Sequence, residues 1–122
     1  MSDITINVSY NGNNDEIAII CPEGYIDTTT SPEIEDVLLK VLEHKKYRVI
    51  MDLENVDYVN SSGWGVFIRE IKQMRENRGD LVLVKMTPDV YAVYETMEFS
   101  KILKAFNSID GALAYFKEIG GS

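Results

Sequence analysis

The sequence predicts a single α/β domain with a mixed, largely parallel sheet of four to five strands and about four helices. Three observations support this fold class. The chain has 122 residues, of which 45% are hydrophobic and 26% are charged, as in one ordinary globular domain. Its first two strand-like segments are joined by a hairpin signal, and strand-like and helix-like segments alternate from there on. Such alternation is typical of parallel strands joined by helical crossovers.

The hairpin comes first. Apolar and polar residues alternate over 4–10, which predicts a strand with one buried face. The dipeptide Asn11-Gly12 favours a tight turn. A continuous apolar run over 17–21 then predicts a strand buried on both faces, which Pro22 and Gly24 are expected to end.

The first helix is predicted to begin at Ser31-Pro32, because serine can cap a helix and proline suits its first position. In an alternative register, Thr30 and Glu33 form a capping box. An apolar stripe at helical spacing follows, namely Ile34, Val37, Leu38, Val41 and Leu42. Residues 49–53 then predict a third buried strand, and residues 55–60 are predicted to be a connection.

The second half of the chain continues the alternation. A helix is predicted from about Ser62 to Asn77, and its buried stripe is Trp64, Phe67, Ile68, Ile71 and Met74. A buried strand over 81–86 and a third helix from Thr87-Pro88 follow, with Val90, Val93, Tyr94 and Met97 expected to face inward. A short strand over 104–106, a last helix from about 107 and a flexible tail over 118–122 complete the single domain, 1–122.

Composition narrows the function. Twenty acidic residues against twelve Lys and Arg give a net charge of −8 and an isoelectric point near 4.6. Because nucleic acids and anionic membranes bind through basic patches, neither is an expected partner, and a protein is. No apolar run reaches the roughly 18 residues of a membrane-spanning helix, and no signal segment precedes the domain, so a cytoplasmic location is expected.

The catalytic inventory is small. The chain has one histidine, His44, and one cysteine, Cys21, so no disulfide framework and no Cys/His zinc site is expected. Neither a phosphate-binding glycine loop nor a nucleophile elbow occurs. The sequence therefore predicts a protein that is not an enzyme and holds no metal or cofactor.

Two loops are the best candidates for a binding surface. The segment 60–65, Asn-Ser-Ser-Gly-Trp-Gly, leads into the second helix, and the segment 24–30 follows the preceding parallel strand. Both should open on the carboxyl edge of the sheet, where α/β proteins bind ligands and where helix amides favour a phosphate. The simpler alternative is that 60–65 only caps the helix and provides small residues for tight packing.

These residues carry a resemblance that covers nearly the whole chain. The segments 24–27, 49–53, 59–65 and 81–84 resemble a STAS domain of the anti-sigma factor antagonist kind. The helix that carries Val90 and Tyr94 agrees with it. The glycine–serine motif is weak alone but specific at this spacing from the other segments.

The resemblance implies a switch protein. In that family the unphosphorylated domain binds a GHKL-type serine kinase that is also an anti-sigma factor, and this frees the sigma factor. The kinase phosphorylates one serine, which by position is Ser61 here, and a metal-dependent serine phosphatase reverses the modification. The resemblance implies partner contacts at Asp27, Thr28, Asn60, Ser61, Ser62, Gly63 and Trp64. A monomer or weak dimer is expected, although no sequence pattern indicates dimers.

Two departures leave alternatives open. The family usually has aspartate directly before the phosphoacceptor, where this chain has Asn60, and Trp64 replaces a residue that is typically aliphatic. Trp64 is either a bulky core residue or a partly exposed contact. Two other functions also remain open: an interaction subunit of a larger assembly that is not phosphorylated, and a domain that senses a small ligand or nucleotide.

Overall fold

The computed structural model describes residues 4–120, which form a six-stranded mixed sheet and four α-helices. The strands are β1 (Thr5–Asn11), β2 (Ile17–Ile26), β3 (Arg48–Asp52), β4 (Val56–Val59), β5 (Asp80–Val84) and β6 (Ala105–Phe106). Their order is β1-β2-β3-β5-β6, and β4 pairs with the end of β2. Only the β1–β2 pair is antiparallel within the described sheet. The predicted fold class is confirmed.

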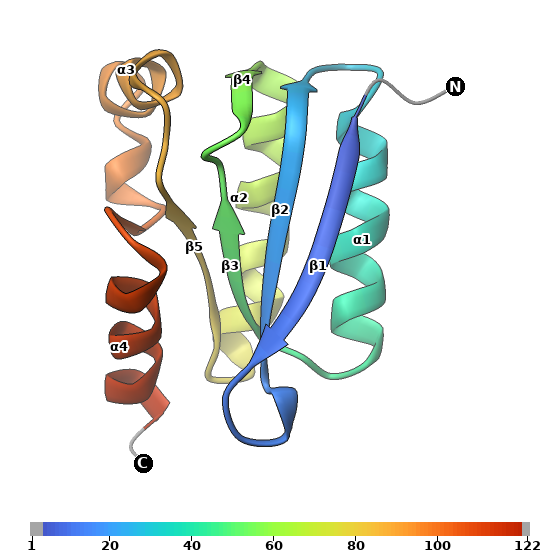
Figure 1. The fold of residues 1–122 in the computed structure, drawn as a ribbon, viewed down its shortest axis with the longest axis vertical. Coiled ribbons are helices and arrows are strands. Elements are labelled where there is room, and N and C mark those ends of the chain that lie inside the picture. The colour runs from blue at the N-terminus through green and yellow to red at the C-terminus, as the bar shows by residue number, and fades with distance from the viewer. Residues whose placement is uncertain (1–3, 121–122) are drawn as a thin grey trace.

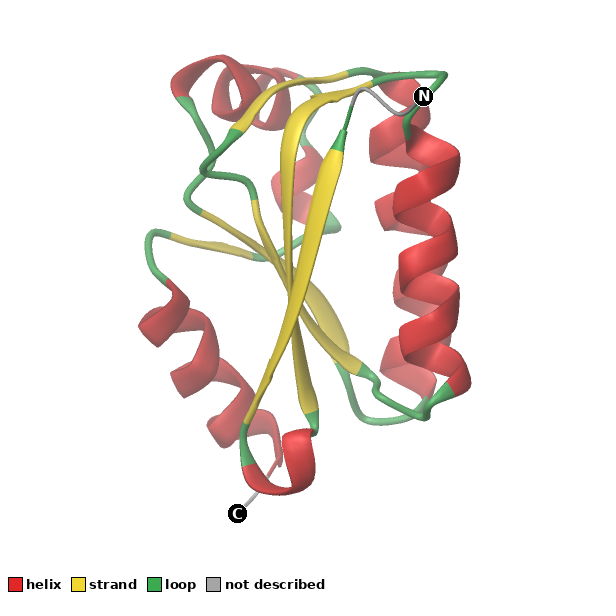
Figure 2. Ribbon diagram, turned by 45° about the vertical axis from the view of Figure 1, so that its right-hand side comes forward, coloured by secondary structure: helices red, strands yellow, loops and turns green. Residues whose placement is uncertain are grey.

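The helices form layers on both faces of the sheet. They are α1 (Ser31–Glu43), α2 (Ser61–Glu76), α3 (Pro88–Thr96) and α4 (Ile109–Gly120), with short 3-10 turns η1 (Asn13–Asp15) and η2 (Phe99–Lys101). Helices α1 and α2 lie side by side behind the sheet in Figure 1, and α4 lies on its other side, as Figure 2 shows. The larger apolar core lies under α1 and α2, and a smaller one lies under α4.

The sheet has one strand more than predicted, because β4 forms where a connection was expected. The ladder between β2 and β3 stops at Ile20 and Met51, and the β2–β4 ladder begins at Gly24 and Val56. Pro22 lies between the two ladders. Neither β3 nor β4 therefore needs a hydrogen bond from the N–H group that proline lacks. Strand β2 therefore continues past Pro22 to Ile26, which corrects the predicted end.

Other elements follow the sequence with small differences. Met97 is 60% exposed, not buried as predicted, because α3 ends at Thr96 and Met97 lies beyond its last turn. The predicted buried face of β1 holds for Ile4 but not for Val8 and Tyr10, which are 38% and 45% exposed on this edge strand. Helix α4 includes residues 118–120 of the expected tail. Residues 121–122 lie outside the described range.

The start of α1 uses neither predicted cap. Thr30 occupies the N-cap position with φ −102° and ψ −22°, and its side chain makes no capping hydrogen bond. Its hydroxyl instead donates to the Tyr25 carbonyl at 2.7 Å. Thr30 therefore ties the beginning of α1 to the end of β2.

Candidate functional site

Two loops meet at the carboxyl edge of the sheet, as the sequence predicts. Ile26 and Val59 are partners in the β2–β4 ladder, and the Asn60 N–H donates to the Ile26 carbonyl at 2.9 Å. Just beyond these partners, Asn60 Nδ2 donates a 3.3 Å hydrogen bond to Thr28 Oγ1. The Thr28 and Ser62 hydroxyl oxygens lie 3.4 Å apart. Thr28, Asn60 and Ser62 thus form one polar cluster.

Asn60 connects this cluster to α2. It occupies the N-cap position in an extended conformation, with φ −90° and ψ −176°. Its Oδ1 accepts hydrogen bonds from the backbone N–H groups of Ser62 at 2.9 Å and Gly63 at 3.3 Å. The carbonyl end of the amide therefore caps the helix while its NH₂ end binds Thr28. An aspartate could cap α2 but could not donate to Thr28.

The cap predicts a measurable contribution to stability. Asn60→Ala is expected to lower the free energy of unfolding by about 1 kcal/mol, because two backbone donors lose their acceptor. Asn60→Asp keeps the acceptor and is expected to remain within about 0.5 kcal/mol of the wild type. Urea unfolding of the three proteins measures both changes. An alanine variant as stable as the wild type would show that the cap does not support the fold.

Ser61 is the first residue of α2, and its side chain is exposed. Among residues 4–120, no side chain or backbone group holds its hydroxyl in a hydrogen bond. The adjacent helix terminus carries the positive end of the α2 dipole, which favours a negative group there. A phosphate on Ser61 would therefore be compatible with the fold around it.

Asp27 holds the facing turn together. Its Oδ1 accepts from the Thr29 hydroxyl at 2.7 Å, the Thr29 N–H at 2.9 Å and the Thr30 N–H at 3.1 Å. These hydrogen bonds, the one from the Thr29 hydroxyl foremost, hold the pKa of the Asp27 carboxyl below its ordinary value. Within the described residues, the side-chain hydrogen bonds of Asp27 all stay inside the turn. Asp27 thus positions Thr28 rather than joining the Thr28–Asn60–Ser62 cluster.

Thr30 was not among the predicted site residues, yet it orders the same turn. It is 2% exposed, and its hydroxyl accepts from the Asp27 N–H at 2.9 Å while donating to Tyr25. The available signal was the run of three threonines after Asp27, since hydroxyl side chains in a turn often bond to nearby backbone groups.

Gly63 and Trp64 lie beneath the surface. A Cβ on Gly63 would come within 2.6 Å of both Ile26 Cγ2 and Val59 Cγ1, so glycine allows α2 to approach the sheet. Trp64 is 2% exposed, its indole N–H donates to the Val59 carbonyl at 3.1 Å, and its ring stacks on Phe99 at 4.8 Å. Trp64 is therefore a core residue, which corrects the expectation that its side chain contributes to the contact surface.

A family model of the STAS domain matches residues 12–112. The chain belongs to the STAS domain family. It is 33% identical over 103 residues to BtrV of Bordetella bronchiseptica, a candidate anti-sigma factor antagonist, in a match that covers 84% of this chain and 89% of BtrV. The resemblance seen in the sequence is confirmed.

Solved structures share the fold. An anti-sigma factor antagonist from Mycobacterium paratuberculosis superposes with a TM-score of 0.82 at 20% identity, over 94% of this chain and 95% of that one. The anti-sigma factor antagonist SpoIIAA in its unphosphorylated form gives a TM-score of 0.71 at 13% identity, over 97% of this chain and 100% of its own. At these identities the likeness establishes the STAS fold alone.

The described part of this STAS domain offers little other chemistry. No group of three or more His, Cys, Asp or Glu residues in it is arranged to hold a metal ion. The half-buried Cys21 thiol lies 3.8 Å from Asp52, and burial, the main cause, raises its pKa together with the Asp52 charge. None of the described helices is long and apolar enough to cross a membrane.

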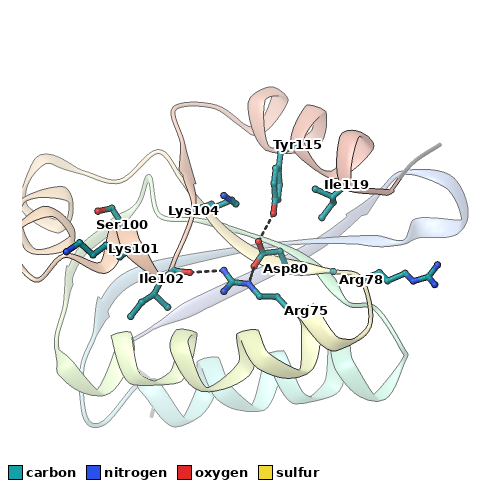
Figure 3. Close-up of a pocket in the computed structure, with 10 residues that line it drawn as sticks. Arg75, Arg78, Asp80, Ser100, Lys101, Ile102, Lys104, Tyr115 and Ile119 are labelled. Atoms are coloured by element: carbon teal, nitrogen blue, oxygen red, sulfur yellow. Dashed lines mark hydrogen bonds and ion pairs between the residues drawn. The ribbon is translucent and has the colours of Figure 1, made fainter.

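A cavity of about 490 Å³ lies at the opposite end of α2 from Ser61 (Figure 3). Its central group is Asp80, whose side chain is 3% exposed. One Asp80 oxygen accepts from Arg75 Nε at 3.0 Å and the other from the Tyr115 hydroxyl at 2.7 Å. Arg75 also donates to the Ile102 carbonyl at 2.7 Å. These bonds join α2, β5, α4 and the η2 turn, so the cluster is a structural clamp.

The clamp predicts a loss of stability at alkaline pH. Burial, and then the hydrogen bond to Asp80, raise the pKa of Tyr115 from 10 to about 12. The neutral phenol therefore stabilises the fold fully below a pH of about 10, and this contribution is lost as the pH rises to about 12. Chemical unfolding across this interval is expected to show a shallower pH dependence for Tyr115→Phe than for the wild type. If the stability of both proteins fell equally with pH, the titration of Tyr115 would not contribute to the alkaline loss, which would contradict the raised pKa of Tyr115.

Proposed function

We propose that this STAS domain is an anti-sigma factor antagonist that a phosphate on Ser61 switches off. In its unphosphorylated form it binds an anti-sigma factor of the GHKL serine kinase type and so frees a sigma factor. The observation that carries the proposal is the exposed Ser61 hydroxyl at the start of α2, beside the Thr28–Asn60–Ser62 cluster. The names of the relatives support it. Such a protein acts in the cytoplasm, with the sigma factor.

The surface around Ser61 suits a charge-operated switch. The hydroxyl and amide groups of the Thr28–Asn60–Ser62 cluster are uncharged, and the Asp27 carboxylate in the facing turn is hydrogen-bonded within that turn. In the reaction the Ser61 Oγ forms a bond to the γ-phosphorus of ATP, the bond to ADP breaks, and the hydroxyl proton is released. The phosphate adds about −1.5 to −2 charges to the surface.

The fold and the interface respond differently to that charge. At the N-terminus of α2 the phosphate is favoured by the helix dipole, so the domain is expected to keep its structure. At a protein interface the same phosphate must lose water and meet groups that fitted a neutral serine. Phosphorylation therefore weakens binding without unfolding, and hydrolysis by a serine phosphatase restores the binding surface.

The direct test uses the cognate anti-sigma factor kinase that the proposal requires. The purified domain is expected to bind it in calorimetry, and incubation with ATP and Mg²⁺ is expected to add one phosphate to Ser61 in intact-mass and peptide analysis. Binding should be lost in proportion to the phosphorylated fraction. An absence of binding by the unphosphorylated domain would contradict the proposed function.

Asn60 favours one alternative, an interaction subunit that is never phosphorylated. It lacks the charge that the family usually has before the phosphoacceptor, although it keeps the helix cap. For such a subunit the same experiment would give stable binding, an unchanged mass after incubation with ATP, and no effect of ATP on affinity. The mass therefore separates the two functions.

A further inference from the structure

Strands β2 and β4 end in a pair of exposed tyrosines. Tyr25 and Tyr58 are direct partners in the parallel ladder, and they are 56% and 46% exposed. The next pair, Ile26 and Val59, is 0% and 2% exposed and belongs to the core under α1 and α2. Because partners in a parallel ladder point to the same face, both tyrosines lie on the outer face of the sheet.

A register shift creates this pair. Gly24 is the partner of Val56, but the next residue, Tyr25, is the partner of Tyr58, so β4 carries Asp57 as one extra residue. If β4 alternated regularly, without this bulge, the Tyr58 side chain would point to the same side as the buried Val56. Bulges of this kind re-aim side chains and occur next to functional sites. Here the bulge turns Tyr58 outward beside Tyr25.

The tyrosine pair adjoins the proposed switch surface. Tyr25 precedes Asp27 by two residues, and Tyr58 precedes Asn60 by two residues. The Tyr25 carbonyl also accepts the Thr30 hydroxyl that orders the Asp27 turn. In Figure 1, α2 lies behind the upper ends of β2 and β4, and no helix lies in front of them. The aromatic pair and the Thr28–Asn60–Ser62 cluster thus border one another.

We propose that Tyr25 and Tyr58 form the apolar centre of the surface that binds the anti-sigma factor, an inference that rests on the proposed function. Tyrosines combine a large apolar area with a polar tip and few rotatable bonds, and they are enriched among residues that dominate binding energy. Exposed Asp57 and Glu23 lie on the same two strands. The matching partner surface is an apolar pocket flanked by Lys or Arg.

A second copy of this chain is a poorer occupant. In a two-fold symmetric dimer centred on the tyrosines, the same patch would face itself, so Asp57 and Glu23 would approach their own copies. Each copy also carries a net charge of −8. Like charges brought together at an interface oppose association. A basic-flanked partner meets the same acidic groups with favourable charge.

The test measures affinity for the unphosphorylated domain and the cognate anti-sigma factor. Tyr25→Ala and Tyr58→Ala are each expected to weaken binding by about 30-fold, as at other interface anchors, with unchanged melting temperatures. Tyr58→Phe, which keeps the ring, is expected to bind within about threefold of the wild type. The matched control is Tyr10→Ala, which removes a tyrosine that is 45% exposed near the other end of the sheet, opposite Ala18.

The outcomes separate this inference from the function on which it rests. If the wild type binds and both alanine variants bind as tightly as Tyr10→Ala, the tyrosine patch is not the anchor, while the proposed function stands. If the wild type itself does not bind the anti-sigma factor, the proposed function is wrong, and the inference about the tyrosine pair, which rests on it, is overturned as well. Selective loss in the two alanine variants supports both.

Discussion

Ser61→Asp is expected to weaken binding to the anti-sigma factor by at least about a hundredfold, corresponding to roughly 3 kcal/mol, while Ser61→Ala binds like the wild type. The aspartate places a permanent negative charge at the position of the phosphate, beside the uncharged Thr28–Asn60–Ser62 cluster. Alanine removes only a hydroxyl that no described residue holds. Calorimetry or surface-based binding with the purified partner measures both affinities.

A matched control separates position from total charge. Ser9→Asp adds the same charge at an exposed serine on β1, an edge strand that pairs with β2 and carries none of the residues of the Thr28–Asn60–Ser62 cluster. It is expected to bind like the wild type. If Ser61→Asp and Ser61→Ala bound with equal affinity, a charge at Ser61 would not operate the switch. Ser61 would then be only the first residue of a helix.

Trp64→Ala is expected to lower the free energy of unfolding by about 3–5 kcal/mol, a large part of the total for a domain of this size. Trp64 is 2% exposed, stacks on Phe99 and meets Phe67 edge-on with ring centroids 5.8 Å apart. Truncation would leave a cavity between α2 and the η2 turn. Urea unfolding followed by far-UV circular dichroism measures the loss.

Trp64→Phe tests the two contributions of the indole separately. It keeps an aromatic ring in the core but leaves the Val59 carbonyl without its donor, so a smaller loss of about 1–3 kcal/mol is expected. A loss below about 1 kcal/mol for Trp64→Ala itself would contradict tight packing at this position.

Much of the fold follows from the apolar pattern, because long periodic segments identify elements well. β4 escapes this pattern for a physical reason. It has four residues, its bulge places Asp57 and Tyr58 outward in succession, and its partner is the part of β2 beyond Pro22. The sequence of β4 therefore shows no alternation of apolar and polar residues from which a strand could be predicted. Tertiary contacts determine that β4 pairs with β2.

The candidate site was predicted in part. Asn60 and Ser61 carry local signals for a helix start, and the loop order placed Thr28 near them. Trp64 was assigned both to the buried stripe of α2 and to the contact surface, and only the first prediction is right. The capping box failed because Thr30 has a helical backbone conformation, whereas such a cap needs an extended one.

The two outer edges of the sheet have unequal protection against strand-to-strand association. On one side, β6 has two residues and pairs only with Leu83 and Val84 of β5. At the start of β5, Asp80 is bonded to Arg75 and Tyr115, and its side chain also accepts the Leu81 N–H at 2.9 Å. On the other side, β1 reads Thr-Ile-Asn-Val-Ser-Tyr-Asn, with no charge and no proline in its seven residues. Natural edge strands usually use such residues to discourage pairing with other chains. At high protein concentration, self-association is therefore expected to begin at β1. The substitution Val8→Lys would place a charge on this exposed strand and is expected to keep the domain monodisperse.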